Sequence, residues 1–217
     1  AILRKPDADG VRTEIMCNRC HGHLGHVFVG EGLTQKNLRH CVNSRSVEFV
    51  HDLNVVDTEE AIVAGGCFWG IDYHLAKLKG ALLTQAIYTG GHIDQPTYSQ
   101  VCSKTTGHLE AVRLMYDPTR LDYETVLKTF FEIHDFEQTD GQGPDIGPQY
   151  LSAVFYLTPQ QKDIAQTLIK QLQNKGYHVA TKLKPASTLW EAEKEHQHYY
   201  QKQSKMPYCH IRRAVFN

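Results

Sequence analysis

A cysteine set between glycines and aromatic residues is the group in this sequence best suited to chemistry. Cys67 lies in the segment GGCFWG at residues 65–70, directly after the short apolar run at residues 61–64. A strand that ends in two glycines and is followed by helically spaced apolar residues places the sulfur at a helix N-terminus. Unpaired amides and the helix dipole favour the thiolate there. We therefore predict that Cys67 is a nucleophile and not an inert core cysteine.

The other five cysteines are spread unevenly along the chain. Cys17 and Cys20 have the spacing of a metal-binding knuckle, whereas Cys41, Cys102 and Cys209 each stand alone. Six cysteines in 217 residues are too few for a disulfide scaffold, so we expect several separate roles. The cysteine pattern leaves the redox compartment open.

Composition limits the classes of protein to which the chain can belong. With 217 residues and 41% hydrophobic content, it can form one medium domain and a small one. A net charge of -1 and a pI near 7.0 argue against nucleic acid and anionic membranes as partners. No apolar run approaches the roughly 18 residues of a membrane span, and the N-terminal sequence AILRKP lacks a secretory core. These features favour a cytoplasmic location for a chain that starts at Ala1.

A change in composition predicts where the chain divides. The first part is rich in His, Cys, Gly and Asn, with short strands expected at residues 12–16, 25–29 and 46–50. We predict a small all-β domain at 1–52, a polar linker at 53–60 and a larger domain at 61–217.

Strands and helices alternate in the larger part. Besides the run at 61–64, strands are expected at residues 82–88, 109–116, 151–157 and 177–183, and helices follow Cys67 and occupy 121–134, 160–174 and 189–203. Thr158 and Pro159 supply an N-cap and a first-turn proline, and Gly176 stops the helix that they begin. This alternation predicts an α+β fold, sandwich-like, with a mixed sheet and flanking helices.

Several motifs in one order now identify a family. The larger part contains GCFWG at 66–70, YTGG at 88–91, TY at 97–98, TGHLEAV at 106–112, YDP at 116–118, FFEIHD at 130–135, QGPDIG at 142–147, QYLS at 149–152, AEKEHQ at 192–197 and YC at 208–209. This series resembles peptide methionine sulfoxide reductase type A over residues 61–217. The resemblance implies reduction of the S-epimer of methionine sulfoxide, free or in oxidised proteins, without a cofactor and with thioredoxin or an equivalent dithiol as reductant.

The first 50 residues resemble a different family. RTEI at 12–15, CNRC at 17–20, HLGHVF at 23–28 and RHCVNS at 39–44 are similar to the C-terminal part of methionine sulfoxide reductase type B. The type B pattern also includes an upstream CxxC pair and a GWPSF segment, and neither precedes Cys17. The chain thus resembles the junction of a B-then-A fusion enzyme, interrupted within B.

Sulfoxide reduction needs a thiolate that attacks sulfur and an acid that protonates the departing oxygen. Cys67 is the expected attacking group. A carboxyl group whose pKa is raised by an apolar site can supply the proton. Glu110, in the expected strand at 109–116, matches the family motif for this acid, although a lone glutamate in a strand is usually a surface group.

The resemblance assigns the surrounding residues. Tyr98 and Tyr150 match the phenols that surround the sulfoxide oxygen, and Asp145 matches the acceptor for polar groups of the substrate backbone. Phe68 and Trp69 would form an apolar cage for the substrate methyl group. Each of these residues has an ordinary structural alternative, as a packed aromatic or, for Asp145, a turn residue.

The sulfenic acid left on Cys67 must be resolved by a second thiol. Cys209 matches the family's resolving position, with Pro207 in place of the usual glycine. Cys102 lies inside another motif, and we interpret it as structural.

In the N-terminal part, the type B resemblance assigns Cys41 as nucleophile, with His23, His26 and Asn43 around the oxygen. Cys17 and Cys20 match half of a four-cysteine structural zinc site, which an intact type B domain would complete. With the other pair missing, we expect R-epimer reduction only if the missing half is supplied.

Two other classes of function stay open at the level of sequence. Cys41, Cys67 and Cys209 could exchange disulfides in a redox relay without reducing sulfoxide. Alternatively, Cys17 and Cys20 could form a zinc-knuckle binding module. Turnover of the separate sulfoxide epimers and the zinc content of the chain distinguish these alternatives.

Overall fold

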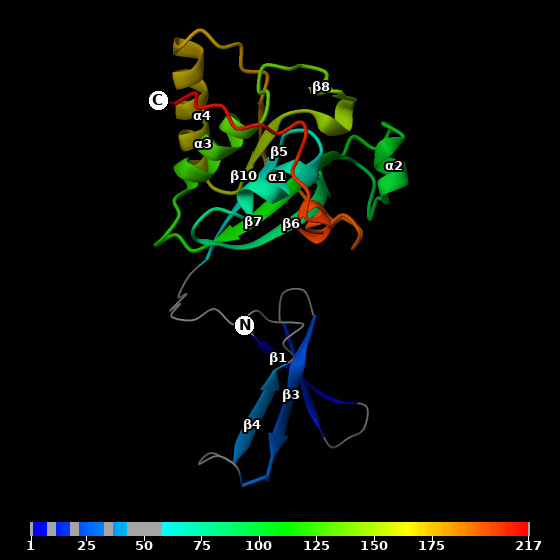
Figure 1. The fold of residues 1–217 in the computed structure, drawn as a ribbon. Coiled ribbons are helices and arrows are strands. Elements are labelled where there is room, and N and C mark those ends of the chain that lie inside the picture. The colour runs from blue at the N-terminus through cyan, green and yellow to red at the C-terminus, as the bar shows by residue number, and fades with distance from the viewer. Residues whose placement is uncertain (1, 8–11, 18–21, 33–36, 43–57, 217) are drawn as a thin grey trace. The chain divides into compact units, whose positions relative to one another are not determined.

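The chain forms two compact units, Ala1–Asn54 and Val55–Asn217, in a computed structural model. The structure describes residues 2–7, 12–17, 22–32, 37–42 and 58–216 (Figure 1).

The described residues of the N-terminal unit form four antiparallel strands, in agreement with the predicted all-β remnant. They are β1 (Ile2–Pro6), β2 (Thr13–Cys17), β3 (His23–Val29) and β4 (Leu38–Val42), in the order β1-β2-β3-β4. Strands β2 and β3 correspond to the predicted strands at 12–16 and 25–29. The strand predicted at 46–50 lies outside the described residues.

A six-stranded mixed sheet is the centre of the second unit. Its strands are β5 (Glu59–Ala64), β6 (Ala81–Thr89), β7 (Leu109–Tyr116), β10 (Ala153–Tyr156), β11 (Lys182–Pro185) and β12 (Leu189–Glu191), in the order β11-β10-β5-β7-β6-β12. The pair β10–β11 is parallel and the other pairs are antiparallel. A small separate sheet pairs β8 (Gly141–Gln142) with β9 (Asp145–Ile146). The mixed sheet confirms the predicted fold class.

Helices flank this sheet. They are α1 (Phe68–Leu75), α2 (Tyr98–Cys102), α3 (Tyr123–Ile133), α4 (Pro159–Asn174) and α5 (Tyr199–Gln203), with a 3-10 helix, η1 (Pro148–Tyr150). Helices α3 and α4 lie side by side, and the C-terminal segment runs past α1 towards them (Figure 1). Thr158 caps α4 with proline at its first position, as predicted. None of the helices in the described part of the chain has the length and apolar character needed to cross a membrane.

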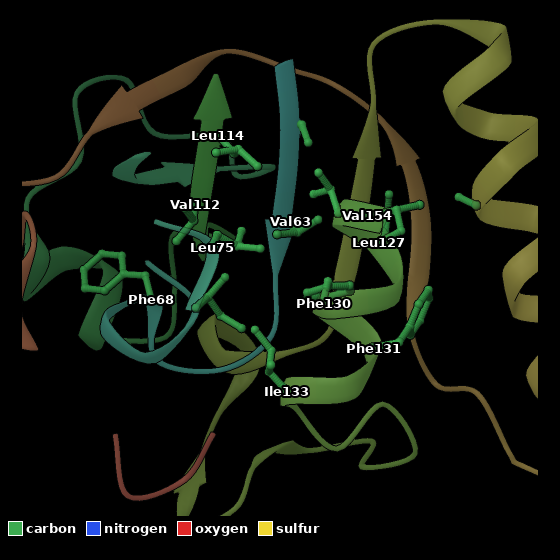
Figure 2. Close-up of a cluster of buried hydrophobic side chains, with 14 of the residues drawn as sticks. Val63, Phe68, Leu75, Val112, Leu114, Leu127, Phe130, Phe131, Ile133 and Val154 are labelled. Carbon is green, nitrogen blue, oxygen red and sulfur yellow. The ribbon is translucent and has the colours of Figure 1, made fainter. Parts of the chain in front are cut away.

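The core lies between the sheet and α1, α3 and α4. Figure 2 shows Leu127, Phe130 and Phe131 of α3 beside Val63 of β5 and Val154 of β10. All five side chains are fully buried. This packing holds β5 and the start of α1 in place, and Cys67 lies between those two elements.

The last predicted elements differ from the structure. The strand expected at 177–183 is observed at Lys182–Pro185, where it pairs with β10. The prediction of a helix at 189–203 is wrong for the first two thirds of that range. Leu189–Glu191 forms an extended edge strand on β6, and His198 has a left-handed backbone with φ of 53°, so helix α5 begins only at Tyr199. Pairing with a distant strand overrides the local helical pattern.

Candidate active site

Cys67 is the N-cap residue of α1, at the helix N-terminus where the sequence places it. Its pKa is nevertheless raised, which corrects the expectation of a ready thiolate. Burial is the main cause, and the nearby Glu110 carboxylate adds to it, whereas the backbone amide of Trp69 acts in the opposite direction. Desolvation therefore outweighs the helix amides, and the resting thiol is protonated at neutral pH.

Glu110 is the second residue of β7, opposite Tyr88 of β6, and its side chain is only 1% exposed. Its Oε2 atom accepts a hydrogen bond of 3.2 Å from the amide of Phe68, the first residue of α1. Its Oε1 atom has no hydrogen-bond partner among the described residues. Burial raises the pKa of Glu110 to about 8. The carboxyl group is thus protonated at neutral pH and has one oxygen left to serve a ligand.

Two phenols lie near this carboxyl group. Tyr98 is the first residue of α2, and Tyr150 is the last residue of η1. Both side chains are half-buried, and burial raises both pKa values, with Glu110 contributing in each case. Both phenols therefore keep their protons at neutral pH and can donate hydrogen bonds to an oxygen near Glu110.

Asp145 and Cys209 also lie near Cys67. Both groups contribute to the raised pKa of Cys67, which places them close to its sulfur. Burial also raises the pKa of Asp145, whose carboxylate accepts a hydrogen bond of 3.5 Å from the Tyr208 hydroxyl. Both cysteines are free thiols in this structure. Cys67 and the five other residues predicted for catalysis in this unit therefore form one cluster.

The two aromatic residues after Cys67 occupy different environments. Phe68 is 1% exposed and packs against Tyr88, with ring centroids 5.8 Å apart. Trp69 is half-buried and stacks on Tyr199 of α5, with centroids 3.6 Å apart and planes 7° from parallel. Phe68 therefore belongs to the core beneath the site, while Trp69 is the more accessible of the two residues predicted to form the cage.

Two residues of the segment 192–197 support the site, although sequence reasoning gave them no role. Glu193 accepts hydrogen bonds from the Tyr98 amide at 2.7 Å and the Tyr88 hydroxyl at 2.8 Å. His196 accepts one of 3.2 Å from the indole of Trp69, and its ring lies 4.3 Å from that of Tyr98. The AEKEHQ motif was the available signal, but nothing local indicates which distant groups these side chains contact.

Cys102, interpreted from sequence as structural, is half-buried at the end of α2. It shares a hydrogen bond with Tyr98, and burial raises its pKa, with a contribution from Glu110. Cys102 therefore lies at the edge of the cluster around Cys67.

A cavity of about 300 Å³ opens beside Cys209. Gly143, Ile211 and Arg213 are among the residues that line it with the cysteine. Cys209 can therefore be approached from outside the cluster that surrounds Cys67.

The N-terminal unit brings together three of its four predicted site residues. Cys41 on β4 pairs with His26 on β3, and the rings of His23 and His26 lie 5.0 Å apart. His23 hydrogen bonds to Glu14 at 2.7 Å, and His26 to Asp7 at 3.0 Å.

The predicted metal ligands are only partly visible. Cys17 ends β2, while Cys20, like Asn43 of the predicted type B site, lies outside the described residues. Within the described ranges, no group of three or more His, Cys, Asp or Glu side chains is arranged to hold a metal ion.

Comparison with known proteins gives two family matches. Residues 59–217 match the family Peptide methionine sulfoxide reductase, and residues 1–51 match the SelR domain. Among curated proteins, Peptide methionine sulfoxide reductase MsrA of Thermus thermophilus is 42% identical over 154 residues, covering 70% of this chain and 88% of the relative.

Solved structures agree with these matches. Reduced Mxr1 from Saccharomyces cerevisiae has a TM-score of 0.67 at 26% identity, covering 72% of this chain and 92% of that one. Mxr1 in complex with Trx2 has a TM-score of 0.50 at 15% identity, covering 78% and 96%, and this second likeness concerns the fold alone.

Proposed function

The chain belongs to the peptide methionine sulfoxide reductase family and reduces methionine sulfoxide to methionine, and from this premise we propose that the cluster around Cys67 is its active site. The S-epimer, in oxidised proteins or as the free amino acid, is the proposed substrate. The observation that carries the assignment is Glu110, a buried carboxyl group with a pKa of about 8 and one unpartnered oxygen beside the thiol.

In the first step, Cys67 attacks the substrate sulfur while Glu110 gives its proton to the sulfoxide oxygen. The carboxylate so formed takes up the thiol proton, and Glu110 is protonated again at the end. The hydroxyl group then passes to the Cys67 sulfur. The S–O bond of the substrate and the transient bond between the two sulfur atoms break, methionine leaves, and Cys67 carries the oxygen as a sulfenic acid. Because Glu110 accepts the thiol proton, the site does not need a preformed thiolate, consistent with the raised pKa of Cys67.

The neighbouring residues position the substrate. Tyr98 and Tyr150 donate hydrogen bonds to the sulfoxide oxygen, which gains negative charge before it is protonated. Asp145 accepts from polar groups of the substrate backbone. Trp69 contacts the substrate methyl group, and the buried Phe68 supports the same apolar surface from the core.

In the second step, Cys209 attacks the sulfur of the Cys67 sulfenic acid and releases water. The resulting disulfide is the form that an external dithiol reduces. Thioredoxin is the proposed reductant, supported by the cavity through which Cys209 can be approached and by the family to which the chain belongs.

Cys41, His23 and His26 are proposed as the remaining part of a type B site, supported by the SelR match and by their proximity across β3 and β4. In an intact type B domain, Cys17 and Cys20 would supply two thiolates to a structural zinc ion.

The test is turnover of the separate S- and R-epimers by the parent and two variants. The parent should reduce the S-epimer with thioredoxin, and Cys67→Ser should abolish that activity because a serine oxygen cannot take up the sulfoxide oxygen as a sulfenic acid. Cys209→Ser should release about one equivalent of methionine per chain and then stop, since Cys67 alone can take one oxygen. Continued thioredoxin-linked turnover in Cys209→Ser would assign resolution to another thiol. If the parent only exchanged disulfides, the redox-relay alternative would hold.

A further inference from the structure

The residue that follows Cys209 is a buried histidine with a defined proton position. His210 is 2% exposed, and its Nε2 atom lies 2.8 Å from the carbonyl oxygen of Gly65. A carbonyl oxygen can only accept, so Nε2 carries a hydrogen. A neutral imidazole has one N–H group, and Nδ1 is therefore an unprotonated acceptor.

This acceptor faces the thiol of the preceding residue. His210 Nδ1 lies 3.1 Å from Cys209 Sγ, so the thiol is the donor in this contact. Burial lowers the pKa of His210 to about 4, which keeps the imidazole neutral at physiological pH. Burial, with a smaller contribution from Asp145, raises the pKa of Cys209 to about 11. Unaided, only about one thiol in 10⁴ would be ionised at pH 7.

The imidazole is held against the segment that carries the nucleophile. Gly65, its hydrogen-bond partner, is two residues before Cys67. His74, in the last turn of α1, hydrogen bonds to the main-chain oxygen of His210 at 2.9 Å. A Cβ atom at Gly70 would lie 2.1 Å from His210 Nδ1, so the glycine in this turn of α1 makes room for the ring.

We propose that His210 is the general base that activates Cys209 for disulfide formation. The proposal rests on the resolving role of Cys209 proposed above. As Cys209 Sγ attacks Cys67 Sγ, Nδ1 takes the thiol proton, the S–S bond forms and the S–O bond of the sulfenic acid breaks. The imidazolium returns its proton to the leaving hydroxide, which departs as water. Cys209 is oxidised and the Cys67 sulfenic acid is reduced, so no further oxidant is needed.

Other titratable groups surround the pair and could compete as base. Asp145 on β9 and Tyr208 face Cys209, while His74 of α1 and His134, next to α3, face His210. His74 already uses Nε2 in the bond to the main chain. His134 contacts the Phe130 carbonyl and Ser152. Tyr208 keeps its proton at neutral pH because burial raises its pKa to about 12. Asp145 is therefore the competitor to be tested.

The experiment is a single turnover of the full chain with methionine S-sulfoxide and no reductant. Samples are quenched and alkylated, then analysed for methionine and for the peptide containing the Cys67–Cys209 disulfide. The variant is His210→Gln, whose amide can donate to the Gly65 carbonyl but offers no base to Cys209. Its matched control is His178→Gln, the same change at an exposed histidine.

The expected result separates the two steps. His210→Gln should release its one equivalent of methionine at the parent rate, while disulfide formation slows by about 10²- to 10⁴-fold. Between about pH 6 and pH 7.5, the parent disulfide rate should be nearly constant, since neither His210 nor Cys209 changes charge there. The variant rate should rise about tenfold per pH unit, because hydroxide replaces the imidazole. His178→Gln should match the parent.

A second variant guards against a purely structural effect. His210→Ala leaves space for a small base, and added imidazole should restore the disulfide rate in proportion to its unprotonated form. No recovery at high imidazole would reduce His210 to a packing role and overturn the proposal. An unchanged rate of disulfide formation in His210→Gln would also overturn the proposal. The same holds if Asp145→Asn slows disulfide formation and His210→Gln does not. If the parent itself forms no Cys67–Cys209 disulfide, the resolving role of Cys209 fails first, and the role of His210 fails with it.

Discussion

A buried carboxyl group decides what the thiol beside it can do. Glu110 is desolvated to the point that its pKa is about 8, and when ionised it helps to raise the pKa of Cys67. In isolation each shift looks unfavourable, since the thiol is a weak nucleophile and the carboxyl a weak acid. Together the two groups hold the two protons that the first step uses. Glu110 gives its proton to the sulfoxide oxygen, and the proton of the Cys67 thiol then replaces it.

Glu110→Gln should separate activity from stability. At neutral pH, release of methionine in a single turnover should slow by about 10²- to 10⁴-fold, because Gln can hydrogen bond to the oxygen but cannot protonate it. Methionine release at the parent rate would move the proton donor elsewhere, with Tyr98 the next group to test.

Compared with the parent, Glu110→Gln should also become more stable as the pH rises. The folded pKa of Glu110, about 8, exceeds the ordinary glutamate value of 4.5, so its contribution to stability is fully present below pH 4.5 and is lost as pH rises through 8. Gln has no such loss. Urea unfolding of both proteins across this range should show a difference that grows in favour of the variant and levels off above pH 8. A constant difference would contradict the assigned burial.

Sequence alone locates the residues whose type reveals their chemistry, but not those that act through distant partners. Cys67 could be predicted because a thiol among glycines and aromatic residues is unusual, and Glu110 because it lies in a motif that matches the family. Glu193 and His210 could not. Glu193 binds groups 95 and 105 positions away, and His210 binds a carbonyl 145 positions away. The predicted helix N-terminus at Cys67 is confirmed, but burial outweighs its effect on the thiol, and burial is a property of the assembled core that sequence does not show.

At the scale of elements, local pattern succeeds where a strand or helix contributes to the main core. The strand predicted at 109–116 is β7, and the helix predicted at 160–174 is α4 with one more residue. The pattern fails at 189–203 because Leu189–Glu191 completes the edge of the sheet on β6. The segment that follows is attached to β6 through Gln197. The side-chain amide of Gln197 accepts a hydrogen bond from the Ala86 amide and donates one to the Ala86 carbonyl oxygen.

Glu193 links that segment to β6 and to the first residue of α2, so Glu193→Gln should weaken both connections. Gln can still accept from the Tyr88 hydroxyl, but its amide group would then face the Tyr98 amide. Loss of this bond should cost about 1–3 kcal/mol of unfolding free energy. Because Tyr98 would be less well positioned, kcat/KM should fall about tenfold, which corresponds to roughly 1.4 kcal/mol.

The control for this prediction is Glu195→Gln, the same change at an exposed position of the same segment. Chemical denaturation and steady-state kinetics of both variants provide the measurement. Equal effects in the two variants would show that the segment contributes through charge rather than through the bonds of Glu193.

At the scale of the whole molecule, the two units differ greatly in the apolar area that they bury. Ile15 and Val27 are the buried hydrophobic side chains among the described residues of the first unit, whereas the second has a continuous core. A unit with so little burial gains little stability from the hydrophobic effect. We therefore expect the amides of β1–β4 to exchange with solvent much faster than those of β5–β7.

Function should follow the same division. The chain should reduce the S-epimer but not the R-epimer, and Cys41→Ser should leave S-epimer turnover unchanged, because the groups around Cys67 all belong to the second unit. The measurement is epimer-specific turnover together with hydrogen exchange of the full chain. Robust R-epimer reduction that disappears in Cys41→Ser would show a working type B site in this chain or in a fragment associated with it.

The stacking of Trp69 on Tyr199 gives the enzyme an optical reporter of its own. The chain has two tryptophans, and the other, Trp190, lies in the edge strand β12. Trp69 is two residues from Cys67, shares a hydrogen bond with His196 and is covered by a ring from α5. Any movement of α5 that accompanies disulfide formation would uncover the indole and alter its emission. In a Trp190→Phe background, the fluorescence of a single native residue would follow each turnover in real time without a label.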